Sequence, residues 1–304
     1  MLDLTHEERA AAARGLMRPA HSAFFGGLIG KAMTVVYKLA GKDRYDDFLL
    51  ERVLGLPFVV TPSVFNPKVP RTGEFFASTL DLTLVGREAE VLDMGTGSGV
   101  CAVFAARHAR RVVAVDINAA AVRCAGINAR LNHLEHKIDV RLGDLFAPVS
   151  AERFDLILFN PPFLRGTPRD DRDRAWRSSD VAERFAAGLG AHLKPGGSAL
   201  VLLSSFGDAR GFLEEFYKHD FAVAVHAERR FVNERLAIFR LTPPGPRRTT
   251  CPPHRLKALA HRRPRRRRAA GSRSCSTIHR RSSSRCHWLC SPSAPNSTRM
   301  STRS

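Results

Sequence analysis

Several marks of common protein classes are missing from this chain of 304 residues. The chain contains no run of eighteen apolar residues, the length that a membrane-spanning helix needs, and the N-terminus lacks a secretory signal pattern. Four of the six cysteines lie beyond residue 242. The other two, Cys101 and Cys124, are isolated on expected helices, so we interpret them as reduced core residues rather than a disulfide framework. We therefore expect a cytoplasmic globular protein.

Acidic residues are absent from the segment 243–304, which contains fifteen Arg and one Lys. This segment carries +16 of the net charge of +19, so residues 1–242 carry only +3. It has few large apolar residues, and we expect a disordered basic tail because so little surface can be buried. A nucleic-acid-binding arm is an alternative, and so is a zinc site from Cys286, His287 and Cys290, although their spacing fits no standard zinc template.

The abrupt change of composition after Thr242 also resembles an altered reading frame, which would make the tail an artefact. We therefore infer no nucleic-acid binding from it.

The first 84 residues divide into two expected parts. Apolar residues at helical spacing predict a helical N-terminal subdomain over residues 1–55, with its last helix at 43–54. A cap or substrate-recruiting role fits this subdomain, and a membrane-surface helix is the alternative for the apolar run from Phe24. Prolines between residues 56 and 74 exclude a helix and favour a short hairpin, followed by a helix at 74–84.

Residues 85–242 alternate between apolar strands and helices. We expect strands at 89–94, 111–116, 138–142, 154–160, 198–204, 221–227 and 236–241, and helices at 99–108, 119–131, 180–193 and 208–219. This alternation predicts an α/β fold with a doubly wound, mostly parallel, seven-stranded Rossmann-like sheet. No helix separates the last two strands, so one of them should be antiparallel.

A glycine-rich turn follows the first of these strands. Gly95, Gly97 and Gly99 alternate there, and glycine lets a ligand approach the backbone next to a helix N-terminus. The spacing G-x-G-x-G differs from the G-x-G-x-x-G of dinucleotide folds, which disfavours a nicotinamide dehydrogenase. Asp93 precedes the turn and would repel a pyrophosphate, but it suits a cationic or amino-bearing ligand.

Two further acids stand at the ends of the next two strands, at the sheet edge where ligands bind in open α/β folds. Asp116 could accept hydrogen bonds from both hydroxyls of a ribose, although it could instead belong to the helix cap at Asn118. Asp144 could accept from an adenine amino group with Leu145 and Phe146 packing nearby, although a plain turn would also place an acid there.

The most specific signal is Asn160-Pro161-Pro162-Phe163, which follows the fourth strand. The prolines fix the backbone and remove two N–H donors, so the Asn160 side-chain carbonyl and the Pro161 backbone carbonyl are free to accept from one planar amino group. Holding both protons would aim the nitrogen lone pair. Phe163 offers a face for stacking on a planar substrate. The alternative is a proline turn that only ends the strand.

Taken together, these motifs make residues 56–242 resemble the class I S-adenosylmethionine-dependent methyltransferases, especially the HemK/PrmC-like branch that methylates a glutamine amide in release factors. The segment from Phe58 to Glu74 is similar to that branch's region before the core. The resemblance implies S-adenosylmethionine as cofactor and no metal. It implies cofactor contacts at Asp93, Gly95, Thr96, Gly97, Asp116, Asp144, Leu145 and Asn160, a catalytic clamp at Asn160 and Pro161, and substrate contacts at Asn160, Pro161, Pro162 and Phe163.

The methyl acceptor stays open among several classes. A protein glutamine, as in release factors, is the first, but the glutamine enzymes usually have tyrosine where this chain has Phe163. Phe at this position also occurs in RNA guanine amino-group methyltransferases, so an RNA base or a small aromatic metabolite is the alternative. A nucleoside-binding module without turnover is a third possibility. The charged loop 165–177 could be a substrate-side lid carrying Trp176, or a solvated loop with internal ion pairs.

Overall fold

The computed structural model describes residues 15, 48–66, 72–169, 173–231 and 234–244. By contacts the chain divides into one unit at Met1–Arg248 and another at Thr249–Ser304, and the description concerns the first. The helices expected before residue 43 lie outside the described residues except for Gly15, and so do the basic tail beyond residue 244 and its candidate zinc ligands. Within the described part, no helix is long and apolar enough to span a membrane.

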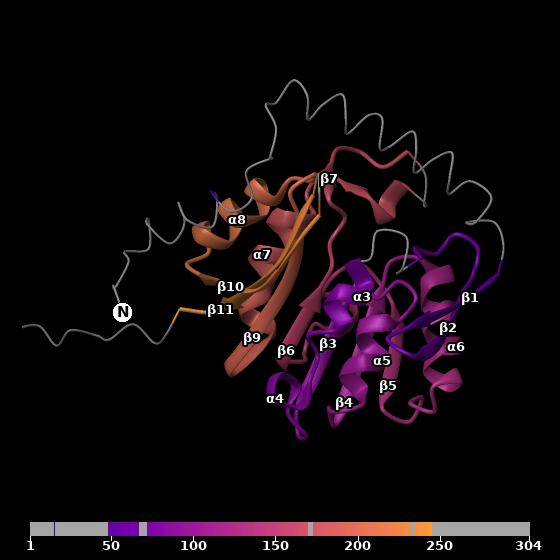
Figure 1. Cartoon of the computed structure of the whole chain (residues 1–304). Coiled ribbons are helices and arrows are strands. Elements are labelled where there is room, and N and C mark those ends of the chain that lie inside the picture. The colour runs from indigo at the N-terminus through magenta and orange to yellow at the C-terminus, as the bar shows by residue number, and fades with distance from the viewer. Residues whose placement is uncertain (1–14, 16–47, 67–71, 170–172, 232–233, 245–304) are drawn as a thin grey trace, which may run out of the picture. The chain divides into compact units, whose positions relative to one another are not determined.

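A seven-stranded sheet forms the centre of the described chain, in the order β10–β11–β9–β6–β3–β4–β5 (Figure 1). Its strands are β3 (Glu90–Met94), β4 (Arg111–Asp116), β5 (Ile138–Leu142), β6 (Phe154–Phe159), β9 (Leu193–Ser204), β10 (Ala222–Arg230) and β11 (Arg235–Thr242). Neighbours from β9 to β5 run parallel, whereas β11 is antiparallel to both β9 and β10. The expected doubly wound sheet with one reversed strand is confirmed.

Helices cover both faces of the sheet (Figure 1). They are α3 (Thr72–Ala77), α4 (Leu82–Val85), α5 (Val100–Ala106), α6 (Ala119–Leu131), α7 (Val181–His192) and α8 (Ala209–Lys218). Successive strand residues enter two separate cores: Leu92 packs with the residues of α7 and α8, and Val91 with those of α3 and α5. Burial on both faces explains why the central strands are continuously apolar.

The strand order reverses between β3 and β6. The chain runs outward from β3 through β4 to β5, then returns to pair β6 with the other side of β3. In such sheets, ligands bind at the carboxyl ends of the strands beside this reversal. The glycine turn after β3 and the proline motif after β6 therefore meet at one place.

The helix expected at 43–54 is wrong over its described part. Leu49–Val53 is strand β1, which pairs antiparallel with β2 (Leu56–Val60). Leu54 and Gly55 both have positive φ, 47° and 88°, as a two-residue type I′ hairpin turn requires. The hairpin thus begins earlier than the expected boundary at residue 56.

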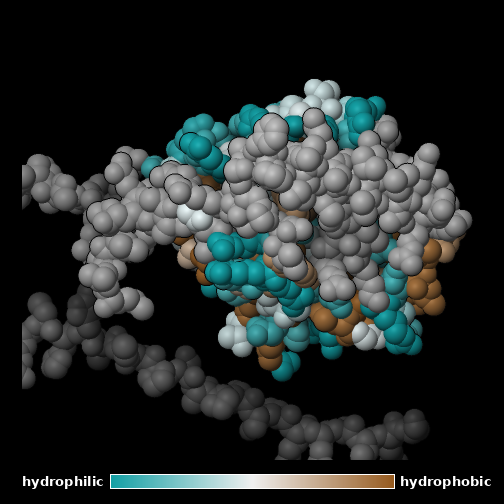
Figure 2. All heavy atoms as spheres, turned by 45° about the horizontal axis from the view of Figure 1, so that its top comes forward, coloured by the Kyte–Doolittle hydropathy of each residue, from teal (hydrophilic) through white to brown (hydrophobic). Residues whose placement is uncertain are grey.

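The outer face of this hairpin carries two exposed apolar side chains beside Arg52. Phe48 and Leu50 are 72% and 74% exposed. Figure 2 shows hydrophobic atoms at the edge where β1 and β2 lie in Figure 1.

The helix expected at 74–84 forms as two shorter helices. The first, α3, ends at Ala77, and the second, α4, begins at Leu82, where the Asp81 side chain accepts from the Leu84 N–H.

Candidate active site

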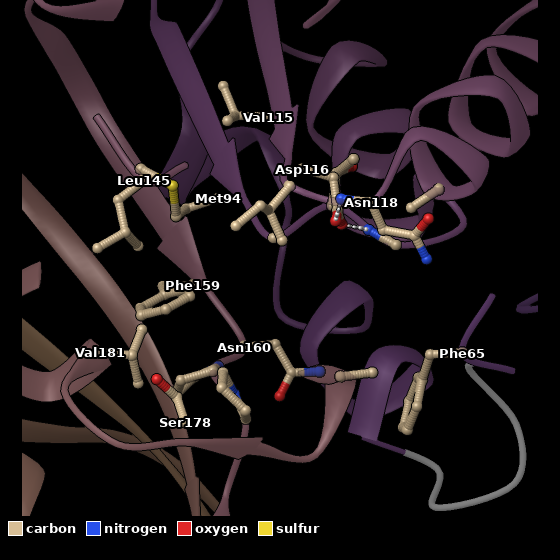
Figure 3. A pocket seen from close by; sticks show the side chains of 18 of the residues that line it. Phe65, Met94, Val115, Asp116, Asn118, Leu145, Phe159, Asn160, Ser178 and Val181 are labelled. Atoms are coloured by element: carbon tan, nitrogen blue, oxygen red, sulfur yellow. Dashed lines mark hydrogen bonds between the residues drawn. The ribbon is translucent and has the colours of Figure 1, made fainter. Parts of the chain in front are cut away.

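One pocket, beside the reversal of the strand order, is lined by all eleven residues that the sequence assigned to the cofactor and substrate contacts. Its lining includes the turn after β3, the ends of β4 and β5, and the motif after β6. Figure 3 shows Asp116 and Asn118 on one side, Asn160 and Ser178 across from them, and an apolar wall that includes Leu145. The topology thus brings these segments together although up to 70 residues separate them in the chain.

The glycine turn is tied to the sheet by Asp93. Its buried carboxylate accepts from the Thr96 hydroxyl at 2.6 Å and from the Ala102 N–H, at the start of α5, at 2.9 Å. Burial, with a smaller contribution from the nearby charge of Asp116, raises the pKa of Asp93 to about 7, against the lowering effect of both hydrogen bonds. Asp93 is therefore a structural anchor of the turn and an acid that titrates near neutral pH.

The three glycines of the turn have different requirements. All have positive φ: 63° at Gly95, 57° at Gly97 and 82° at Gly99. A Cβ on Gly97 would meet nothing within 4 Å, so its surroundings there are open. A Cβ on Gly99 would lie 3.0 Å from the Ala125 Cα, so this glycine lets α5 and α6 approach. Gly95 and Gly97 line the pocket, whereas Gly99 serves helix packing.

Asp116, at the end of β4, faces the pocket with both oxygens held by backbone groups. One oxygen accepts from the Gly97 N–H at 2.8 Å and the other from the Asn118 N–H at 2.9 Å (Figure 3). Asn118 itself caps α6 through the Ala120 N–H. Burial raises the pKa of Asp116, with these hydrogen bonds opposing the rise. The helix-cap and pocket interpretations of Asp116 are therefore compatible.

Asp144 and Leu145 lie in the loop after β5. Leu145 has a φ of 47°, which is uncommon for a residue with a side chain. The Asp144 carboxylate accepts from the Arg184 guanidinium of α7 at 2.6 Å. Sequence reasoning missed Arg184, because an arginine on an amphipathic helix carries no signal that it faces a loop forty residues earlier.

The side chain of Asn160 presents an unused acceptor. Its Oδ1 is buried and has no hydrogen-bond partner, while its Nδ2 lies 3.5 Å from the Thr72 hydroxyl. An unpaired buried carbonyl is costly, on the order of 1–3 kcal/mol, so such a group points to a bound donor. Pro161 and Pro162 line the same pocket.

The exit of the proline motif is fixed to the turn before α8. The Phe163 carbonyl accepts from the Asp208 N–H at 2.8 Å, and a Cβ on Gly207 would lie 2.3 Å from that carbonyl oxygen. Arg165 then forms ion pairs with Glu183 of α7 and with Asp208. Phe163 is half-buried, packs against the core and also lines the pocket.

The loop after the motif forms one wall of the pocket. Strands β7 (Leu164–Arg165) and β8 (Arg177–Ser178) pair in parallel. A short 3₁₀ helix, η2 (Asp173–Ala175), precedes β8. Another, η1 (Ala147–Val149), follows Phe146 in the loop after β5. Asp173 pairs with Arg169 and Arg177, and hydrogen bonding from Arg169 lowers its pKa to about 2. The internal ion pairs expected for this loop are confirmed, and its role as a lid stays a prediction.

Trp176 meets Phe65 edge to face at the pocket, with ring centroids 4.8 Å apart. Phe65 follows the hairpin β1–β2.

Asn128 of α6, which sequence reasoning also missed, holds this hairpin in place. It is fully buried and forms hydrogen bonds with both the N–H and the carbonyl of Val59, each at 2.7 Å, as a neighbouring strand would. It also donates to the Ser98 carbonyl in the glycine turn at 2.8 Å. Asn128 thus joins hairpin, helix and turn.

Comparison with known proteins gives the class of protein that this fold and pocket define. The family model of the methyltransferase small domain matches residues 55–232, more than half of the chain. The chain belongs to the methyltransferase small domain family. Its resemblance to class I S-adenosylmethionine-dependent methyltransferases of the HemK/PrmC type is thereby confirmed.

Two relatives and one solved structure place it more closely. A release factor glutamine methyltransferase from Koribacter versatilis is 33% identical over 184 residues, covering 51% of this chain and 65% of the relative. A protein from Methanocaldococcus jannaschii, named provisionally as a protein N5-glutamine methyltransferase, is 32% identical over 200 residues, covering 62% and 97%. The chain thus spans slightly less than two thirds of the Koribacter enzyme but nearly all of the shorter archaeal protein.

The solved structure is the T. thermophilus 16S rRNA N2 G1207 methyltransferase in complex with AdoMet and guanosine. It matches with a TM-score of 0.50 and 25% identity, over 65% of this chain and 50% of that one.

Proposed function

We propose that this chain transfers a methyl group from S-adenosylmethionine to the side-chain amide nitrogen of a protein glutamine. The observation that carries the proposal is the buried, unpartnered Oδ1 of Asn160 in a pocket that also contains the glycine turn. An acceptor without a donor suits a substrate that brings an N–H group. The relatives at 33% and 32% identity carry names of glutamine methyltransferases, which supports the amide as acceptor.

The residues around the turn fit the cofactor. The open space at Gly97 admits a ligand close to the backbone. Asp116 keeps free lone pairs on two fixed oxygens, which suit the two ribose hydroxyls, and Asp144 with Leu145 would border the adenine. Asp93 supplies negative charge for a cationic amino-acid end. When bound, S-adenosylmethionine supplies an electrophilic methyl carbon.

The chain's own residues then orient the acceptor nitrogen. Asn160 Oδ1 and the Pro161 carbonyl would each accept one N–H of the amide, which directs the nitrogen lone pair along the line of methyl transfer. An amide nitrogen is a poor nucleophile, so catalysis rests on orientation and on charge that develops against fixed acceptors. Departure of the amide proton after transfer needs no buried base, because the N-methyl amide cation is strongly acidic.

The second candidate acceptor is an RNA base amino group, which has the same planar N–H₂ geometry. The match to the rRNA guanine methyltransferase and the phenylalanine at position 163 favour it. Both candidates use the same clamp, so the pocket alone does not separate them.

The test is methyl transfer by the purified full chain from labelled S-adenosylmethionine to a cell extract, followed by separate counting of protein, RNA and small molecules. We expect label in protein, recovered as N5-methylglutamine after digestion to peptides. Label that is sensitive to ribonuclease would overturn the glutamine assignment and establish the RNA alternative. Label in no fraction, with cofactor binding intact, would support a binding module instead.

A variant of the clamp tests the mechanism in the same assay. Asn160→Ala should lower the transfer rate by about 100-fold or more while the dissociation constant for S-adenosylmethionine changes by less than about fivefold. Arg210→Ala, which changes an exposed residue that does not line the pocket, is the matched control. If Asn160→Ala transferred methyl groups as fast as the wild type, the clamp would be wrong.

A further inference from the structure

The ion pair between Asp144 and Arg184 joins two parts of the pocket that no sequence motif connects. Asp144 follows β5, whereas Arg184 lies in the first turn of α7, one turn after Val181. All three residues line the pocket. The Arg184 Nη2 donates to one carboxylate oxygen of Asp144, Oδ2, at 2.6 Å.

The loop that carries Asp144 is already anchored below this ion pair by apolar packing. A Cβ on Gly188 would lie 2.6 Å from the Phe146 ring, so α7 receives that ring closely. The Phe146 ring also stacks on Phe185 and His192, with centroids 5.5 Å and 4.3 Å apart. This packing holds the loop backbone without a contribution from Arg184. The guanidinium therefore acts on the direction of the Asp144 side chain.

The stability of the fold gives little reason for this pair. The side chains of Arg184 and Asp144 are 46% and 43% exposed, and ion pairs this exposed contribute little to folding. The guanidinium donates to Oδ2 alone, however, which restrains the carboxylate and leaves Oδ1 able to accept from another donor.

We propose that Arg184 is a positioning residue for the adenine end of the cofactor pocket. It occupies Oδ2 of Asp144 and turns Oδ1 toward the exocyclic amino group of adenine, so that the site prefers adenine over hypoxanthine, which carries a carbonyl there. This inference rests on the proposed function, because it takes an adenosyl cofactor as the ligand.

The experiment compares two stable ligands, S-adenosylhomocysteine and its deaminated analogue S-inosylhomocysteine, by calorimetry on the full chain. The wild type should bind the adenosyl ligand about tenfold or more tightly, because the inosyl carbonyl faces a carboxylate and leaves it unpaired. In Arg184→Ala this ratio should fall to about threefold or less, mainly through weaker adenosyl binding. Arg184→Lys should recover part of the ratio, since it keeps the charge but loses the planar fork.

Two further variants make the outcome decisive. Asp144→Asn can donate to the inosyl carbonyl and should reverse the preference. Arg210→Ala removes a comparable exposed pair with Glu214 on α8 and should leave the ratio unchanged.

The failures are distinguishable. If the wild type bound neither ligand, the proposed function would fail and the inference with it. If the wild type discriminated and Arg184→Ala weakened both ligands equally, Arg184 would have only a general structural role and the proposal would be overturned.

Discussion

Asp93 should make the stability of this protein depend on pH. Burial raises its pKa from an ordinary 3.8 to about 7, so the folded state binds the proton more tightly than the unfolded state. Stability from this group is therefore complete below pH 3.8, falls as the pH rises, and levels off above about pH 7. Each tenfold change in proton affinity is worth about 1.4 kcal/mol, which gives a total loss of about 4 kcal/mol and about 3 kcal/mol between pH 5 and pH 8.

The variant Asp93→Asn isolates this effect. One amide oxygen can still accept from both the Thr96 hydroxyl and the Ala102 N–H, because in the wild type a single carboxylate oxygen receives both. The free energy of unfolding is measured by urea titration for both proteins from pH 5 to pH 8. Subtracting the wild-type value from that of the variant should give a difference that grows by about 3 kcal/mol over this range. Other buried acids, including Asp116, titrate in both proteins and largely cancel.

Ligand affinity should depend on the same proton but in the opposite direction, so it should rise as the stability of the fold falls. A cationic amino group beside Asp93 favours the ionised carboxylate, so the affinity of the wild type for S-adenosylmethionine should increase between pH 6 and pH 8. The Asn variant should lack most of this increase. A stability difference that is constant with pH, together with parallel binding curves, would refute a buried carboxyl that titrates near neutral pH.

Three other substitutions follow from the geometry of the site. Gly99→Ala should destabilise the fold by about 2–4 kcal/mol in chemical denaturation, since its Cβ meets the Ala125 backbone at a φ of 82°, whereas Gly97→Ala, with open space, should cost only about 1 kcal/mol; equal losses would contradict the packing role. Arg165→Ala should lower the transfer rate by about tenfold without changing the dissociation constant for S-adenosylmethionine, because Arg165 braces the motif exit through Asp208 and Glu183. A shift of cofactor affinity as large as the rate loss would argue against that function.

The sheet and the position of the site could be predicted because local patterns determine them. Residues 112–115 of β4 and 156–159 of β6 are continuously apolar, since alternate residues enter cores on opposite faces. Once the strands are assigned, parallel pairing places Asp93, Asp116 and Asn160 at one edge whatever the details of their contacts. The eleven site residues all line the pocket for this reason, while their individual roles stay predictions.

The features that could not be predicted depend on partners far away in the chain. Phe48, Leu49 and Val53 fall at helical spacing, but Leu49–Val53 is a strand, because the turn at Leu54-Gly55 closes a hairpin. Asn128, 69 residues beyond Val59, then binds that hairpin. Arg184 likewise becomes a pocket residue only through Asp144 on another element. In both cases a polar side chain on a helix makes a contact with a distant segment, and no local sequence pattern specifies that contact.

Three costs of folding coincide on the walls of this pocket, and together they argue that the site is built for a ligand. At neutral pH, the ionised and buried Asp93 lowers the free energy of unfolding by about 4 kcal/mol. The unpaired Oδ1 of Asn160 lowers it by on the order of 1–3 kcal/mol, and the positive φ of Leu145 by about 1 kcal/mol. The apolar cores beside the pocket could stabilise the sheet without any of them. A cation beside Asp93 and a donor at Asn160 would remove the two larger costs, so ligand binding and stabilisation of the fold should rise together. An unfolding midpoint that stays unchanged with saturating S-adenosylmethionine would therefore count against the whole assignment of the pocket.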